Sequence, residues 1–165
     1  MSLFPDDITR LATSVLIECR SRGFKIVTAE SCTGGLIAAA LTEIAGSSDV
    51  VDRGFVTYSN ESKIAMLGVR AQSLEAYGAV SKEVALEMAA GAIAKSEADV
   101  AIAVTGVAGP GGGTAQKSVG LVHVAVAGVT GTLHFAYNFG DIGRTEVRLE
   151  TVRAALQMIL KALNG

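Results

Sequence analysis

The stretch from residue 26 to residue 36, with the sequence IVTAESCTGGL, constrains the fold of this chain more than any other. Its β-branched and apolar start favours a buried strand, its glycines favour a sharp turn, and the apolar residues that follow favour a helix. The pattern therefore predicts a strand that turns directly into a helix, with Ser31, Cys32 and Thr33 in the turn. Backbone N–H groups at such a helix N-terminus favour an anionic oxygen, either a phosphate or the oxyanion of a reacting carbonyl.

The composition limits the class of protein. Half of the 165 residues are hydrophobic, but only 5% are aromatic and none is Trp, so the core must be built from Ala, Val, Ile and Leu. Single domains commonly hold about 100 to 200 residues, and we therefore expect one domain over residues 1–165. The net charge of -2 arises without long blocks of either sign, which gives no support for a nucleic-acid or membrane-surface partner.

Sequence signals for export, membrane insertion and metal binding are missing. Cys19 and Cys32 are too few for a disulfide scaffold or a zinc cluster, which favours a reduced cytoplasmic setting. The first residues lack a basic region followed by an apolar core, and no apolar run approaches the roughly 20 residues of a membrane span. We therefore expect a cytoplasmic protein without a metal, a cofactor or a membrane anchor.

Hydrophobic periodicity and capping residues predict an alternation of helices and strands. Helices are expected over residues 5–21, 33–45, 61–66, 71–77, 81–93 and 144–163, and strands over 24–29, 50–58, 99–105, 119–127 and 132–139. The last two strands form a hairpin, so the order predicts a three-layer α/β/α domain with a mixed sheet. Ligands in such sheets lie outside the carboxyl ends of the strands, and we expect both glycine turns and the strand end at Tyr58 to flank one pocket.

The residues of the first turn have competing interpretations. Ser and Thr are common helix caps, so Ser31 or Thr33 is expected to cap the helix, and Ser31 is otherwise a candidate nucleophile. Cys32 is a second candidate, but a catalytic Cys needs an activating group and neither His lies in a motif that supplies one. A small packing residue is the simpler interpretation of Cys32.

Lys63 follows Tyr58 and Asn60 on a short helix, so these side chains are expected at the end of the second strand. A lone Lys there is commonly a solvated surface charge. If Lys63 is partly buried beside Ser31, its pKa falls and it can take the Ser proton as a general base. The Ser-x-x-Lys spacing of β-lactamases is absent, so the fold would have to bring the pair together.

Three further features remain open between a functional and a structural role. The turn over residues 106–114 lacks the P-loop ending, but its glycines suit either a backbone that wraps a phosphate or a mobile loop. Arg144 begins the last helix, where a cation opposes the dipole, which indicates a phosphate contact or a salt bridge with Asp141. His123 and His134 should lie diagonally on one face of the hairpin, where packing or an interface is favoured over a metal site.

Five motifs in order resemble the CinA C-terminal domain family, the nicotinamide-nucleotide amidohydrolases. They are AESCTGG (29–35), YSNxxK (58–63) with LGV (67–69), GAVS (78–81), TGVAGPGGGT (105–114), and FGD (139–141) followed by two arginines. Each motif alone has modest specificity for the family, but the ordered set covers nearly the whole chain and is highly specific. The larger family members add an N-terminal molybdopterin-binding-like domain, so the sequence is similar to the stand-alone deamidase form.

The resemblance implies hydrolysis of the carboxamide of nicotinamide mononucleotide to the acid and ammonia. It implies Ser31 as the nucleophile, Lys63 as its base and Tyr58 as a third catalytic residue. The substrate contacts implied are Cys32, Thr33, Gly34, Gly35, Asn60, Thr105, Gly106, Gly109, Gly111 and Arg144. The N–H groups from Cys32 to Gly35 would hold the oxyanion, and no metal would be needed.

Other functions stay compatible with the residues. A non-catalytic nucleotide-binding or regulatory module could use the same glycine turns as an anion cradle. The partner expected in either case is a small pyridine nucleotide, and the small-residue faces are compatible with a homodimer or a higher homo-oligomer.

Overall fold

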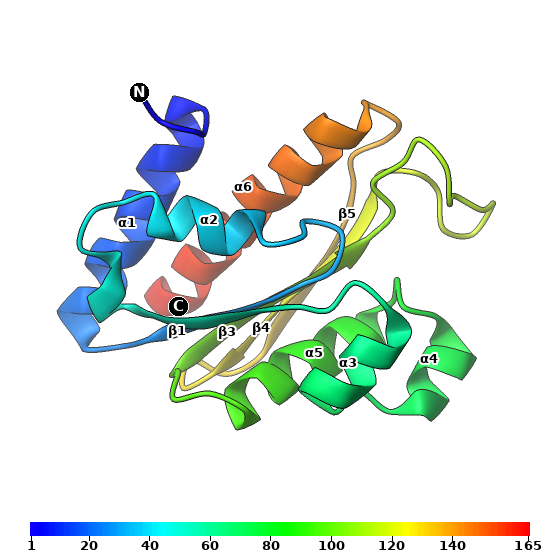
Figure 1. Ribbon diagram of the computed structural model, residues 1–165, viewed down its shortest axis with the longest axis horizontal. Helices are drawn as coiled ribbons and strands as arrows, with labels where there is room; N and C mark the ends of the chain where they lie inside the picture. The colour runs from blue at the N-terminus through cyan, green and yellow to red at the C-terminus, as the bar shows by residue number, and fades with distance from the viewer.

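A five-stranded mixed sheet forms the middle layer of the computed structural model, which describes residues 1–165 (Figure 1). The strands are β1 (Ile26–Glu30), β2 (Val51–Val56), β3 (Val100–Gly106), β4 (Leu121–Gly128) and β5 (Leu133–Asn138). The helices are α1 (Asp6–Arg22), α2 (Leu36–Thr42), α3 (Asn60–Leu67), α4 (Ala71–Tyr77), α5 (Lys82–Ala94) and α6 (Arg144–Asn164), with a 3-10 helix at Ser47–Asp49.

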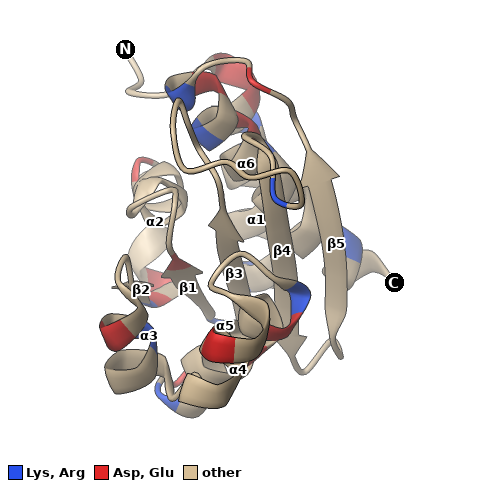
Figure 2. Cartoon of the chain, turned by 90° about the vertical axis from the view of Figure 1, so that its right-hand side faces the viewer, with Lys and Arg blue, Asp and Glu red and all other residues tan.

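The strand order is β2-β1-β3-β4-β5. Strands β2, β1 and β3 run parallel, whereas β4 is antiparallel to β3 and β5. The carboxyl ends of the three parallel strands therefore lie at one edge of the sheet, where Glu30 is level with Val56 and Val104. This edge faces the viewer in Figure 2, which also shows Lys and Arg interspersed with Asp and Glu along the helices. The mixed α/β architecture with a C-terminal hairpin is confirmed.

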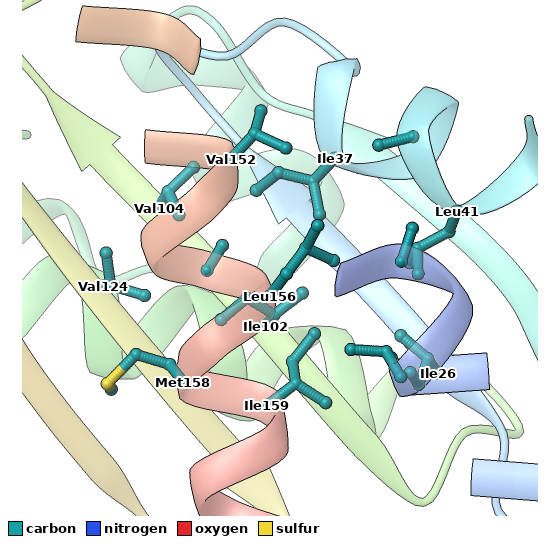
Figure 3. Packing of buried hydrophobic residues seen from close by; sticks show 14 of the residues in the cluster. Ile26, Ile37, Leu41, Ile102, Val104, Val124, Val152, Leu156, Met158 and Ile159 are labelled. Atoms are coloured by element: carbon teal, nitrogen blue, oxygen red, sulfur yellow. The ribbon is translucent and has the colours of Figure 1, made fainter. Parts of the chain in front are cut away.

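Two hydrophobic layers hold helices against the two faces of the sheet. Helices α1, α2 and α6 cover one face, where Ile102 of β3 packs among Leu156 and Ile159 of α6 (Figure 3). Helices α3, α4 and α5 cover the other face, which presents small residues such as Ala101 and Ala103. Small side chains let a helix approach a sheet closely. Close packing of small residues therefore takes the place of the aromatic core that the composition excludes.

All of the predicted helices and strands occur, with shifted ends. The largest shift is in α2, which begins at Leu36 rather than residue 33 and ends at Thr42 rather than residue 45. Its start is delayed because Gly34 and Gly35 have φ angles of 58° and 103°, in the left-handed region that interrupts a helix. The two glycines thus separate Ser31 from the helix by a full turn of irregular backbone. No helix in the structure has both the length and the apolar character needed to span a membrane.

Candidate active site

The ends of the parallel strands and the glycine turns surround a cavity of about 280 Å³. Its walls are Ser31, Cys32, Tyr58, Lys63, Ala79, Val80, residues 105–109, Gly111, Gly112 and Arg144. Each of these segments follows a strand of the sheet or begins a helix beside it. The prediction that both glycine turns and the strand end at Tyr58 flank one pocket is therefore confirmed.

The central contact in the cavity joins Lys63 to Ser31. The Lys63 Nζ atom lies 3.0 Å from Ser31 Oγ and 2.6 Å from the carbonyl oxygen of Thr57. The fold brings the two side chains together because α3 begins just beyond β2, which is the neighbour of β1. Ser59 caps α3 by accepting a hydrogen bond from the N–H of Ser62, and this cap fixes the turn that carries Lys63 inward.

Lys63 is buried without a carboxylate partner. Only 1% of the residue is exposed, and no acidic side chain lies within ion-pair distance of its amine. Burial penalises the charged ammonium and lowers the pKa of Lys63 below the ordinary value of 10.5. A neutral amine suits these surroundings, since it can donate one hydrogen to Thr57 O and accept the hydroxyl proton of Ser31.

The N-terminus of α2 is capped by Glu30, not by Ser31 or Thr33 as the sequence predicts. Glu30 Oε1 accepts hydrogen bonds from the Thr33 hydroxyl at 2.6 Å and the Ile37 N–H at 2.9 Å, and Oε2 accepts one from the Ala38 N–H at 3.0 Å. Gly35, at the formal cap position, contributes no side chain. The first N–H groups of the helix are therefore occupied by a buried carboxylate, which leaves only the turn before the helix for the anionic oxygen that the sequence predicts.

Free N–H groups remain in the turn before the helix. The Ser31 N–H donates to Val104 O at 3.1 Å, and the Gly34 N–H donates to Ser31 O at 3.0 Å. The N–H groups of Cys32, Thr33 and Gly35 have no acceptor among the protein atoms. Of these three residues only Cys32 lines the cavity, so its N–H is the donor best placed to stabilise an oxyanion beside Ser31.

The Cys32 thiol is poorly suited to attack a substrate. The residue is buried at 5% exposure, and burial raises the pKa of its thiol to about 11. Neither histidine lies among the residues that line this cavity. The packing role predicted for Cys32 agrees with these surroundings.

Arg144 lies across the mouth of the cavity between two of its walls. Its Nη1 donates to Gly109 O at 2.8 Å, and its Nη2 donates to the Tyr58 hydroxyl at 2.9 Å. It forms no ion pair with Asp141, so that alternative is wrong. A cation without a carboxylate at the cavity mouth is available to an anionic group of a ligand.

The second glycine turn forms the opposite wall. The Thr105 hydroxyl donates to Ala79 O at 2.8 Å, which ties the end of β3 to the linker before α5. A Cβ at Gly106 would lie 2.6 Å from Val122 Cγ2, so only glycine fits there against β4. The turn continues through Gly111 into a second, wider cavity of about 490 Å³, whose lining includes Asn138 and Asp141.

The structure does not bring every predicted site residue to the cavity. Ser31, Lys63, Tyr58, Cys32 and Arg144 line it together with four residues of the second turn: Thr105, Gly106, Gly109 and Gly111. Thr33 is turned toward Glu30, Gly34 and Gly35 lie outside the cavity wall, and Asn60 is exposed at the start of α3.

Sequence reasoning left Arg148 open as a phosphate contact and missed that Glu30 and Arg148 hold the turn over residues 31–35, which we call the nucleophile turn after its candidate nucleophile Ser31. Glu30 ends an otherwise apolar strand, and an acid in such a place requires hydrogen-bond donors nearby, which was the available signal. Arg148 donates from Nε to Cys32 O at 3.1 Å and from Nη2 to Thr33 O at 3.0 Å. No local pattern assigns Arg148 to that turn, because it lies more than 100 residues further along the chain.

The two histidines form a pair outside this cavity. The hairpin register places His123 opposite Ala136 and His134 opposite Ala125, which confirms the predicted diagonal arrangement. His123 Nδ1 lies 2.9 Å from His134 Nε2, and the rings stack with centroids 5.2 Å apart. No group of three or more His, Cys, Asp or Glu side chains in the structure is placed to hold a metal ion.

A comparison with known protein families shows to which family the chain belongs. The family described as the CinA C-terminal domain matches residues 8–163. The chain belongs to the CinA C-terminal domain family. The crystal structure of the competence/damage inducible protein CihA from Agrobacterium tumefaciens is similar over 100% of both chains, with 60% sequence identity and a TM-score of 0.97.

Members of the CinA C-terminal domain family of different lengths resemble the chain. Nicotinamide-nucleotide amidohydrolase PncC of Enterobacter agglomerans is 47% identical over 151 residues, which cover 92% of each protein. The CinA-like protein of Geotalea daltonii is 49% identical over 162 residues, which cover 98% of this chain and 39% of that protein. The CinA-like protein of Chloroherpeton thalassium shares 62% identity over 66% of this chain and only 26% of its own length. The chain thus spans 26% to 39% of these longer relatives.

Proposed function

We propose that this protein hydrolyses the carboxamide of nicotinamide mononucleotide to nicotinate mononucleotide and ammonia. The observation that carries the proposal is the buried Lys63 amine, 3.0 Å from the Ser31 hydroxyl and without an acidic partner. A hydroxyl beside a base with a lowered pKa is the arrangement that activates a serine nucleophile. The name of the relative from Enterobacter agglomerans, matched over 92% of each chain, supports the choice of a nicotinamide nucleotide.

The chemical steps follow from the contacts of the cavity. The neutral Lys63 amine takes the proton of Ser31, and the Ser31 oxygen adds to the amide carbon to give a tetrahedral oxyanion. The Cys32 N–H donates to that oxyanion. Lys63 returns its proton to the amide nitrogen, the C–N bond breaks and ammonia leaves. Water then attacks the ester, with Lys63 as the base, and regenerates the Ser31 hydroxyl.

The remaining walls suit the rest of the nucleotide. The inner cavity of about 280 Å³ suits the pyridine carboxamide, and the wider cavity beyond Gly111 leaves room for the ribose phosphate. Arg144 lines the inner cavity beside Gly109 and supplies a cation for the phosphate or for a ribose hydroxyl. The Tyr58 hydroxyl, held by Arg144, is placed to donate a hydrogen bond to substrate at the cavity mouth.

Ammonia release from a panel of pyridine amides tests the proposal. The purified protein should release ammonia from nicotinamide mononucleotide faster than from nicotinamide, because only the nucleotide reaches Arg144. The activity should survive a chelator, since Lys63 and the backbone donors supply both proton transfer and oxyanion stabilisation. Tight nucleotide binding with no ammonia from any amide would contradict the proposal and favour a non-catalytic binding module instead.

A further inference from the structure

The three arginines of α6 differ in what neutralises their charge. Arg153 pairs with Asp7 at 2.5 Å and with Glu150 at 3.0 Å. Arg144 and Arg148 have no carboxylate partner, and both donate to groups that surround the cavity. Arg144 lines the cavity, whereas Arg148 lies behind the nucleophile turn and does not reach the cavity wall. The two unpaired cations therefore act on the site from different sides.

The hydrogen bonds of Arg148 orient successive peptide groups. Its guanidinium binds the carbonyls of Cys32 and Thr33, at 3.1 Å and 3.0 Å. In a trans peptide the N–H points opposite to the carbonyl, so the N–H groups of Thr33 and Gly34 are directed away from Arg148. The Gly34 N–H then donates to Ser31 O at 3.0 Å.

The direction of the Cys32 N–H follows from the same peptide geometry. Because the Ser31 carbonyl is held by Gly34, the N–H of the same peptide, which belongs to Cys32, points in the opposite direction. That N–H has no protein acceptor, and Cys32 lines the cavity beside Ser31. The positive charge of Arg148 is also felt at this wall, since it works to lower the pKa of the Cys32 thiol against the larger effect of burial.

We propose that Arg148 is a positioning residue, which sets the Cys32 N–H as the oxyanion donor by binding the carbonyls of the nucleophile turn. Glycine at position 34 permits this turn, because its φ angle of 58° lies in the left-handed region that disfavours other residues. Glu30 holds the other side of the turn through Thr33 and α2. The turn is thus fixed between a carboxylate and a guanidinium that do not touch each other.

Steady-state kinetics of Arg148→Met and Arg148→Lys test this role. The inference rests on the proposed function for this measurement. Loss of an ordered oxyanion donor should lower kcat by about 10- to 100-fold and leave KM within about threefold, because the interaction is made mainly in the transition state. Arg148→Lys keeps the charge but lacks the planar fork of two nitrogen donors, so its kcat should fall between those of Arg148→Met and the parent. A rise in KM with unchanged kcat would overturn the proposal and assign Arg148 to substrate binding.

Arg153→Met is the matched control on the same helix. It loses two carboxylate contacts, so its melting temperature should fall at least as far as that of Arg148→Met, while its kcat stays at the parent value. If Arg153→Met lowers kcat as much as Arg148→Met, the effect of Arg148 is only to dock α6, and the positioning role is wrong. Arg148→Lys keeps the test decisive if Arg148→Met fails to fold.

Covalent labelling by a fluorophosphonate separates this inference from the choice of substrate. Ser31 Oγ bonds to phosphorus, Lys63 accepts the serine proton and fluoride leaves, and the phosphoryl oxygen occupies the oxyanion position. Arg148→Met should slow labelling by the same factor as kcat, even if the parent releases no ammonia from nicotinamide mononucleotide. Labelling of Arg148→Met at the parent rate would overturn the inference, and so would a parent protein whose Ser31 does not react.

Discussion

At the scale of single residues, the proposed chemistry depends on a lysine that is buried without a counter-charge. Structural lysines are usually solvated or paired, whereas Lys63 contacts only a hydroxyl and a carbonyl oxygen. Its environment therefore favours the neutral amine, which is the form that can accept a proton. Neighbouring Cys32 shows the opposite effect of the same burial, since desolvation raises the pKa of its thiol to about 11 and keeps it protonated.

The pH dependence of kcat/KM should report the titration of Lys63. Its pKa is lowered by burial, and the base is active only when neutral, so activity should be lost as the pH falls through this lowered pKa. The midpoint of the rise should therefore lie below pH 10.5, the ordinary value for lysine. A midpoint at or above the pH where free lysine titrates would contradict the role of Lys63.

At the scale of elements, α2 depends on Glu30 for its start. The helix has seven residues and no side-chain cap of its own, and its first N–H groups are satisfied by a carboxylate from the preceding strand. Sequence reasoning placed the cap on Ser31 or Thr33, because Ser and Thr at such positions commonly cap helices. The cap differs from the predicted one because the two glycines extend the turn. The Glu30 side chain at the end of β1 can then reach the first N–H groups of α2.

Glu30→Gln should lower the free energy of unfolding by about 1 to 3 kcal/mol, because buried charge-assisted hydrogen bonds become weaker neutral ones and one amide N–H is left unsatisfied. Urea denaturation measures the change. Glu75→Gln on the exposed surface of α4, where the side chain makes no hydrogen bond, is the matched control and should change stability by less than about 0.5 kcal/mol. Equal losses in both variants would rule out the capping role.

The β4–β5 hairpin should weaken in acid because of its histidine pair. Burial is the main cause that lowers the pKa values of both histidines. The charges of His134 and Lys117 lower the pKa of His123 further, and the charge of Lys82 does so for His134. The unfolded chain then binds protons more readily, so the stability contributed by the neutral pair is present above the ordinary pKa of 6.5 and is lost as the pH falls below it. Glu83 acts in the opposite direction but does not reverse either shift.

Thermal unfolding between pH 7.5 and pH 5 should show this loss. The melting temperature of the parent protein should fall more steeply than that of His134→Gln, which removes one titrating group and the repulsion between the rings. Parallel slopes for the two proteins would show that the pair does not couple stability to pH.

At the scale of the whole molecule, the order of elements and the location of the site followed from sequence, whereas the contacts within the site did not. Periodicity and capping residues gave every helix and strand, and the glycine turns after two strands indicated the edge that holds the cavity. Lys63 could be placed near Ser31 only by the ordered motifs shared with a family. The contact with Arg148 depends on how α6 crosses behind the turn, which no local pattern encodes.

The family match and the cavity extend over the same part of the chain. The match to the CinA C-terminal domain covers residues 8–163, and the cavity is formed by segments spread across that range. The names of homologous proteins do not decide which of two adjacent side chains, Ser31 or Cys32, attacks the substrate. The central claim is therefore the identity and activation of the nucleophile.

The kcat/KM for ammonia release from nicotinamide mononucleotide by Ser31→Ala and Cys32→Ala tests this claim most directly. Ser31→Ala should lose at least about 10³-fold, because loss of the nucleophile leaves only the oxyanion site and binding. Cys32→Ala should retain activity within about tenfold, since its backbone N–H remains and only packing changes. Activity at the parent level in Ser31→Ala, or its loss in Cys32→Ala alone, would contradict the mechanism.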